Sequence, residues 1–186
     1  MKRLISLLLI AGLLAGCATD SGELDKVLLL RSDLQKGNKC SFDVDVTADY
    51  GDSVTSFTLT CASDNQQNMR IVVQKPESIS GVSCEISGEK GSLTFDEKVL
   101  AFEMIADGQL TPISAPWLMM KALHGGYISA ISKEKEGVFV RLDDSYSGCV
   151  FSVDLWLNEN NTPEQAEIVW QGKRILSMRI SNFEIL

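Results

Sequence analysis

The cysteine at position 17 is the residue whose surroundings most clearly indicate chemistry. Residues 2–3 are basic, residues 4–14 are apolar except for one serine, and Ala15 and Gly16 stand directly before Cys17. A basic start, a short apolar run and a small-residue end are typical of a secretory signal that is cleaved after export. The run is far shorter than the roughly 20 apolar residues of a transmembrane helix. We therefore expect export of the chain and cleavage between Gly16 and Cys17.

The segment Leu14-Ala15-Gly16-Cys17 resembles the lipobox of bacterial lipoproteins, in which a leucine, a small residue and Gly or Ala precede the cysteine. The resemblance implies that the sulfur of Cys17 receives a diacylglyceryl group and that the modified cysteine becomes residue one. Acyl chains such as palmitate then hold the protein at the cell membrane, on its extracytoplasmic face. Residues 1–16 are expected to be the signal peptide, residues 17–20 a lipidated tether, and residues 21–186 a single domain close to the membrane.

The net charge of the mature chain limits the classes of partner that it is expected to bind. After cleavage, 15 basic residues stand against 25 acidic ones, a net charge of −10. This excess argues against a nucleic-acid partner and against electrostatic adhesion to anionic lipid head groups. No later run approaches 18 consecutive apolar residues, so the rest of the chain is expected to be water-soluble. The expected link to the membrane is therefore the lipid on Cys17 and not surface charge.

The sequence holds no recognisable catalytic constellation. Its single histidine, His124, lies at the end of a predicted helix and is interpreted as structural or as a cation that complements the helix dipole. No serine lies in a Gly-x-Ser-x-Gly setting, and no phosphate-binding glycine loop is present. The cysteines lack the Cys-x-x-Cys spacing of zinc sites. We expect no enzyme activity, no cofactor and no metal.

Four cysteines remain once Cys17 is modified, and they allow three disulfide pairings. If a hairpin turns at residues 50–51, Cys40 faces Cys61 on the neighbouring strand, which makes this pair the best-supported bridge. By elimination, Cys84 would then pair with Cys149. The alternative is that all four are buried free thiols, because free cysteine is among the most buried residue types.

Residues 21–34 are predicted to form an amphipathic helix directly after the tether. Arg31 falls on its apolar stripe and is expected to lay its stem along the stripe with its head in water. The stripe follows helical spacing and consists of Leu24, Val27, Leu28 and Leu34.

From residue 40 onward the hydrophobic period changes to two, which predicts short antiparallel strands. A second helix, over residues 112–124, interrupts them. The run of short strands predicts a mainly β fold of the α+β class, with a curled sheet forming a sandwich or barrel. The strands are expected over residues 40–47, 54–61, 69–75, 79–86, 92–95, 99–105, 137–143, 149–158, 167–170 and 174–180.

The closing segments 161–168, 172–176 and 180–183 resemble the LolA/LolB and LppX group of lipoprotein and lipid carriers, with a proline, a strand, a glycine turn, a second strand and a terminal Asn-Phe. The resemblance implies an unclosed antiparallel barrel whose concave face is capped by helices and holds an acyl chain. A membrane anchor suits the LolB or LppX side of the group. The spacing also looks like LolA-like lipoproteins of single-membrane Gram-positive bacteria, where moving lipoproteins to an outer membrane cannot be the task.

Aromatic and methionine side chains are the candidates for lining such a half-barrel cavity, although each can also be ordinary core. The run Trp117-Leu118-Met119-Met120 stands out because its side chains point all round the predicted helix. One side of it should therefore face a cavity, a partner or the membrane. The candidate ligand-binding residues are Phe57, Leu59, Phe102, Met104, Trp117, Met120 and Trp156.

Two functions remain open at this point. The first is a membrane-anchored, non-catalytic lipoprotein that binds a lipid or acyl chain. The alternative is an interaction or scaffold module with a filled core, serving an envelope or sporulation complex through a protein partner. Internal volume separates them, because a ligand carrier must leave roughly several hundred Å³ of apolar space.

Overall fold

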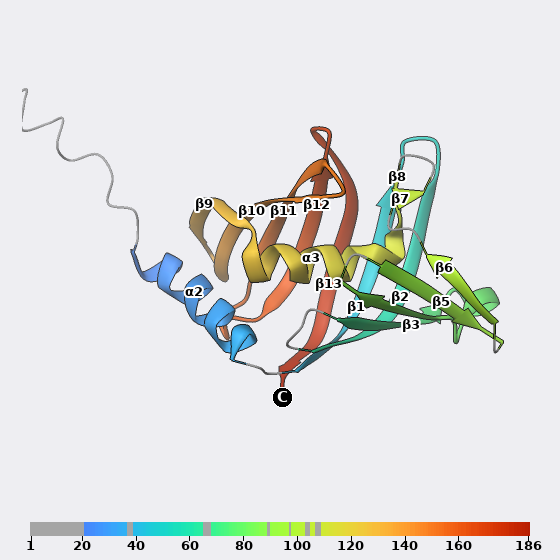
Figure 1. The fold of residues 1–186 in the computed structure, drawn as a ribbon. Helices are drawn as coiled ribbons and strands as arrows, with labels where there is room; N and C mark the ends of the chain where they lie inside the picture. Colours follow the sequence, from blue (N-terminus) through green and yellow to red (C-terminus); the bar gives the residue numbers. More distant parts are fainter. Residues whose placement is uncertain are drawn as a thin grey trace, which may run out of the picture.

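The computed structural model describes residues 21–36, 39–64, 68–88, 90–96, 98–102, 105–106 and 109–186, without the side chains of residues 21 and 101–109. Cys17 and the expected cleavage site lie outside the described residues. Most of the described chain forms one antiparallel sheet of 11 strands (Figure 1). Its strands are β1 (Cys40–Asp49), β2 (Val54–Ser63), β3 (Met69–Lys75), β4 (Ser83–Ser87), β5 (Lys90–Phe95), β6 (Lys98–Phe102), β9 (Tyr127–Glu134), β10 (Gly137–Tyr146), β11 (Cys149–Leu157), β12 (Pro163–Trp170) and β13 (Lys173–Ile185).

The other elements are short or helical. Helix α2 (Ser21–Gln35) precedes the sheet, and α3 (Ala115–Gly125) interrupts it. Two 3₁₀ turns, η1 (Glu77–Ile79) and η2 (Pro112–Ser114), and a small separate pair of strands, β7 (Ile105–Ala106) and β8 (Gln109–Leu110), complete the described chain. Among the described residues, no helix combines the length and the apolar character that crossing a membrane requires.

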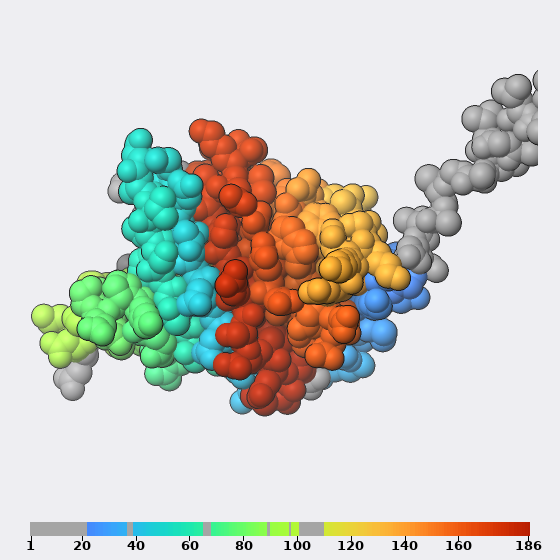
Figure 2. All heavy atoms as spheres, turned by 180° about the vertical axis from the view of Figure 1, so that it is seen from behind, coloured from blue at the N-terminus to red at the C-terminus, as the bar shows by residue number. Residues whose placement is uncertain are grey.

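The sheet follows the order β6-β5-β4-β3-β2-β1-β13-β12-β11-β10-β9, so its two edges are β6 and β9 and it does not close on itself. The last strand, β13, returns to the middle and pairs with β1. Helix α3 crosses one face of the sheet in Figure 1, and the view from behind in Figure 2 shows the opposite face, where strands from β2 to β10 reach the surface. The predicted fold class is confirmed: the protein is mainly β, with an unclosed antiparallel sheet and helices against one face.

The β1–β2 hairpin differs in register from the prediction. Cys61 pairs with Phe42, and Cys40 pairs with Ser63, a shift of two positions. The cause is a longer turn, residues 50–53, whose ends are joined by a backbone hydrogen bond of 3.1 Å from Tyr50 N–H to the carbonyl of Ser53. A shift of two leaves every side chain on its predicted face, because the side-chain period of a strand is two.

Strand β3 has its predicted bounds, whereas β9 was not predicted. All eight residues of β9 are exposed or half-buried, so the strand has no buried apolar face that alternation could reveal. The segment predicted as one strand over residues 99–105 ends as β6 at residue 102, and β7 begins at residue 105. The predicted helix over 112–124 is the turn η2 followed by α3.

The hydrophobic core lies between the concave face of the sheet and the two helices. Alternate residues of the central strands point into it, as the burial of β1 shows from Cys40 to Ala48. Helix α2 contributes a narrower stripe than predicted. Val27, Leu30 and Leu34 are buried, but Leu24 and Leu28 are exposed, which corrects the predicted stripe.

Candidate ligand-binding site

Helix α3 occupies the concave face of the sheet. It contacts α2 and η2 as well as β10, β12 and β13, so its side chains meet protein on several sides. Every residue of α3 except Lys121 and Gly125 is buried, and the side chains of the run 117–120 are at most 3 % exposed. The sequence predicted that one side of this run faces a cavity, a partner or the membrane. Elements α2 and η2 of the same chain provide part of the surface that this side contacts. Trp117 and Met120 are part of the core, and their contact with a ligand stays a prediction.

Contacts with β10 hold one side of α3. The Lys121 ammonium donates to both carboxylate oxygens of Asp144 at 2.7 Å and to the carbonyl of Ser145 at 2.9 Å. The indole of Trp117 meets the ring of Tyr146 edge-on at a centroid distance of 5.6 Å. Asp144 lies within β10, so this contact ties α3 to that strand.

Helix α2 holds the other end of α3. Arg31 donates to the carbonyl oxygens of Ala122 and Gly126, and the side-chain amide of Gln35 donates to the carbonyl of His124. The guanidinium of Arg31 therefore caps the C-terminus of α3 instead of reaching water as predicted. A cation is favourable at this position because the C-terminus of a helix carries partial negative charge on its last carbonyls.

His124 lies beside this contact and is buried. Burial lowers the pKa of His124 from its ordinary value, and the nearby positive charge of Arg31 lowers the pKa further. The imidazole is therefore neutral at pH 7, and its structural interpretation is the one that agrees with the structure. The alternative, a histidine cation complementing the helix dipole, was wrong because Arg31 takes that role.

The four described cysteines are free thiols. Cys40 and Cys61 occupy diagonal positions on neighbouring strands, at which Cα atoms lie about 7–8 Å apart, beyond the usual reach of a disulfide. Cys84 on β4 and Cys149 on β11 have five strands between them in the sheet. Both proposed pairings are therefore corrected, and Cys40, Cys61 and Cys84 are buried small side chains of the core.

A pocket of about 450 Å³ opens at the sheet edge where β1 and β3 begin and β2 and β4 end. We call it the rim pocket. Two cross-strand rows meet there. The buried row runs through Cys40, Ser63, Met69 and Ile86, and the row on the other face of the sheet runs through the half-buried Ser41 and the exposed Ala62, Arg70 and Glu85. Lys39, Asp64, Asn68, Ser87 and Leu186 complete its lining.

Hydrogen bonds order the polar wall of the rim pocket. The side chain of Asp64 accepts from the backbone N–H and the side-chain amide of Asn68, both at 3.0 Å, and the Ser87 hydroxyl donates to the Asn68 side chain at 2.8 Å. On the buried row, burial raises the pKa of the Cys40 thiol to about 11, against an opposing hydrogen bond with Ser63. The thiol therefore stays protonated at neutral pH and offers an apolar surface, not a nucleophile.

The predicted ligand-binding residues do not meet in one place. Leu59 is buried and Phe57 is half-buried against the core. Trp156 lies on the convex face, where its ring is 5.2 Å from that of Phe139, so the prediction assigned it to the wrong face. The side chains of Phe102 and Met104 lie outside the described residues. None of the five described candidates lines the rim pocket.

The sequence did not predict the rim pocket because the residues that line it come from the ends of different strands. Its apolar members are single residues near the ends of four strands, together with Leu186 after β13, and no run or period connects them. Trp156 instead borders a polar hollow of about 610 Å³ on the convex face, together with Glu134, Glu164, Gln165 and Arg179.

Comparisons with known proteins agree with the observed architecture. No family model and no curated protein matches the sequence. An uncharacterized conserved protein from Thermus thermophilus is similar in structure with a TM-score of 0.50 at 10 % identity, over 88 % of this chain and 87 % of that one. A LolA superfamily protein from Nitrosomonas europaea has a TM-score of 0.45 at 10 % identity (86 % and 93 %). The Mycobacterium tuberculosis lipoprotein LppX has a TM-score of 0.40 at 12 % identity (89 % and 96 %). The likeness to the Thermus protein is one of fold.

Proposed function

We propose that this protein is a lipid-anchored lipoprotein on the extracytoplasmic face of the cell membrane that binds a lipid or acyl chain without catalysis. Residues 1–16 would be its signal peptide, residues 17–20 its tether with lipid on Cys17, and residues 21–186 one ligand-binding domain. The observation that supports ligand binding is the rim pocket, because its volume of about 450 Å³ lies within the range of small-molecule sites.

The lining of the rim pocket suits an amphipathic ligand. Cys40, Met69 and Ile86 offer a buried apolar floor for a hydrocarbon segment. The lining also includes the basic residues Lys39 and Arg70 and the acidic residues Asp64 and Glu85, which supply partners for both signs of a polar head group.

The proposal of a non-catalytic role rests on the state of the reactive groups. Burial raises the pKa values of Cys40 and Cys84 to about 11 and about 12, so these thiols are protonated at neutral pH. His124 lies at the C-terminus of α3, where its neighbours are backbone carbonyls and the Arg31 side chain.

Native mass spectrometry tests ligand binding. Residues 18–186 would be purified from a lipid-containing host and extracted with organic solvent. We expect a stoichiometric adduct that is released as lipid, and we expect Ala62→Trp, which fills the rim pocket, to lose it. Ala130→Trp places the same side chain at an exposed position on β9 and should keep the adduct. Loss of the adduct in both variants, or in neither, would contradict binding in the rim pocket.

The packing of α3 favours a second candidate, an interaction module with a filled core. Because side chains of α3 occupy the concave face, the centre of the described fold resembles an ordinary core. Under this alternative, the same spectrum would show a bare mass that incubation with membranes leaves unchanged, and the protein partner would bind the outer surface.

A further inference from the structure

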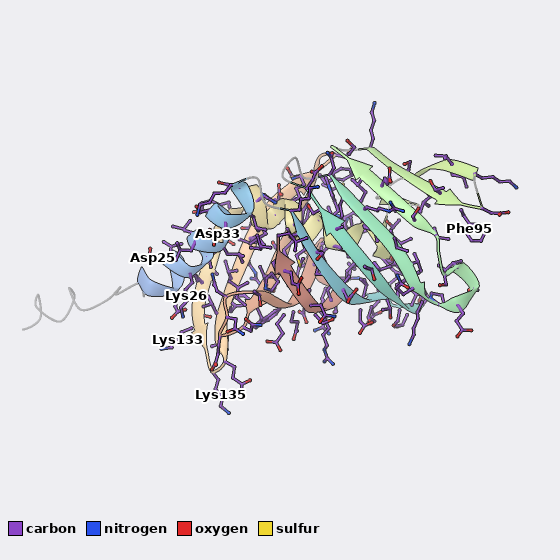
Figure 3. All side chains as sticks on the ribbon, turned by 90° about the horizontal axis from the view of Figure 1, so that it is seen from below. Asp25, Lys26, Asp33, Phe95, Lys133 and Lys135 are labelled. Atoms are coloured by element: carbon purple, nitrogen blue, oxygen red, sulfur yellow. The ribbon has the colours of Figure 1, made fainter. Side chains whose placement is uncertain are left out.

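Helix α2 carries apolar side chains on the side that faces away from the core. Leu24, Leu28 and Leu29 are 37 %, 46 % and 60 % exposed, and we call them the leucine patch. Leu24 and Leu28 lie one turn apart, and Leu29 extends the patch around the helix. Figure 3 shows α2 at the periphery of the molecule, where the chain enters the fold. Core packing therefore does not account for these three leucines.

The chain before α2 limits how far the patch can lie from a lipid anchor. Only residues 18–20 separate Cys17 from Ser21, the first residue of α2. Four peptide steps span at most about 14 Å. The polar layer on each side of a bilayer's hydrocarbon core is roughly 5–8 Å thick, so the tether reaches through it and little further.

The charges of α2 also fit a membrane surface better than those of the whole chain. Residues 21–36 carry three acidic and three basic side chains, whereas the mature chain is strongly acidic. Lys26 pairs with Glu23 at 3.0 Å and Lys36 pairs with Asp33 at 2.8 Å. Asp25 lies beside the patch and forms no ion pair within the described part of the chain, so its carboxylate must remain hydrated. That requirement places the helix among the head groups and not deeper.

We propose that the leucine patch of α2 rests in the head-group region of the bilayer that holds the lipid of Cys17. The inference rests on the proposed function, because it requires lipid on Cys17. An interfacial helix buries its apolar face about 5–10 Å into this region, and a second contact makes a lipid anchor firmer. Two contacts also fix the orientation of the domain. Lys39, four residues beyond the end of α2, lines the rim pocket, so the same helix leads from the anchor to that pocket.

Fluorescence quenching by brominated lipids tests the proposal on the full lipidated protein in phosphatidylcholine nanodiscs. Leu28→Trp places a reporter in the patch, and Val54→Trp places one at an exposed apolar position at the start of β2. A side chain among the head groups lies much nearer the bromines, so we expect at least about twofold stronger quenching of the added emission at position 28.

The intact mass of each sample shows whether Cys17 carries lipid, so the membrane contact of α2 and the lipid anchor are tested separately. Lipidated protein with equal quenching at positions 28 and 54 would overturn the membrane contact of α2 and leave the anchor standing. A mass without lipid on Cys17 would overturn the anchor, and this inference with it. Stronger quenching at position 28 in lipidated protein would establish the contact.

Discussion

The guanidinium of Arg31 in α2 donates a hydrogen bond of 2.6 Å to the carbonyl oxygen of Gly126, the residue directly after α3. A second bond of 3.3 Å reaches the carbonyl of Ala122 in the last turn of α3. The Arg31 side chain therefore connects α2, the helix nearest the predicted anchor, with α3, the helix that lies on the concave face of the sheet. Helix α2 and helix α3 should accordingly behave as one unit.

Removing this connection should destabilise the protein. Arg31→Met keeps most of the apolar stem but removes the side-chain donor to the carbonyl of Gly126, which costs about 1–3 kcal/mol in the free energy of unfolding. Urea denaturation would measure it. Lys36→Met removes an exposed ion pair between Asp33 of α2 and the residue directly after the helix, and should cost at most about 1 kcal/mol. Equal effects of the two substitutions would contradict a special role for Arg31.

The packing of α3 predicts a larger effect in its centre. Leu118 is fully buried, so Leu118→Ala should cost about 2–5 kcal/mol, through lost burial and the cavity left behind. Leu29→Ala removes the same atoms from an exposed position of α2 and should change the stability of the lipid-free chain by no more than about 0.5 kcal/mol. A small effect at Leu118 would mean that α3 is loosely packed and can move to admit a ligand.

The single histidine predicts how stability depends on pH. Burial, with a smaller contribution from Arg31, holds the pKa of His124 below its ordinary value in the folded protein, and unfolding returns it to about 6.5. Below pH 6.5 the unfolded chain therefore binds more protons than the folded one. Stability should be complete above about pH 7 and fall as the pH drops through 6.5 toward the lowered folded-state value.

His124→Phe tests this dependence because it removes the titrating group. The difference in melting temperature between pH 7.5 and pH 5.5 should be smaller in the variant than in the parent chain. The parent chain has no other histidine, so an unchanged difference would show that carboxylates govern this range.

The free thiols predict a specific labelling pattern. Iodoacetamide should modify Cys149, which is half-buried, before Cys40, Cys61 and Cys84, which are buried and whose raised pKa values suppress the thiolate. After unfolding without reductant, all four should react in residues 18–186. A mass about 2 Da below the all-thiol value for each pair of unreactive cysteines would instead reveal a disulfide.

How far the sequence predicts the structure depends on burial. Strand β3 was predicted with its observed bounds, and three of its apolar residues, Met69, Ile71 and Val73, are buried at alternate positions. Strand β9 was missed because none of its residues is buried. Trp156 was assigned to a cavity on residue type alone, although its neighbours Leu155 and Leu157 take the inward positions. The register across a turn and the proximity of strand ends are set only when the chain folds. The sequence pattern alone therefore could not predict the rim pocket.

The pairing of β1 with β13 has a consequence for how the chain acquires its shape. Cys40 lies opposite Ile185 and Ala48 opposite Leu176, so the centre of the sheet joins the first and last strands of the described chain. Contacts this distant in sequence form slowly, because closing a long loop costs conformational entropy before the paired strands lower the free energy. Folding therefore waits for the last strand to be synthesised. Such a delay would suit the export proposed above, because a chain that has not yet folded can pass through a translocation channel.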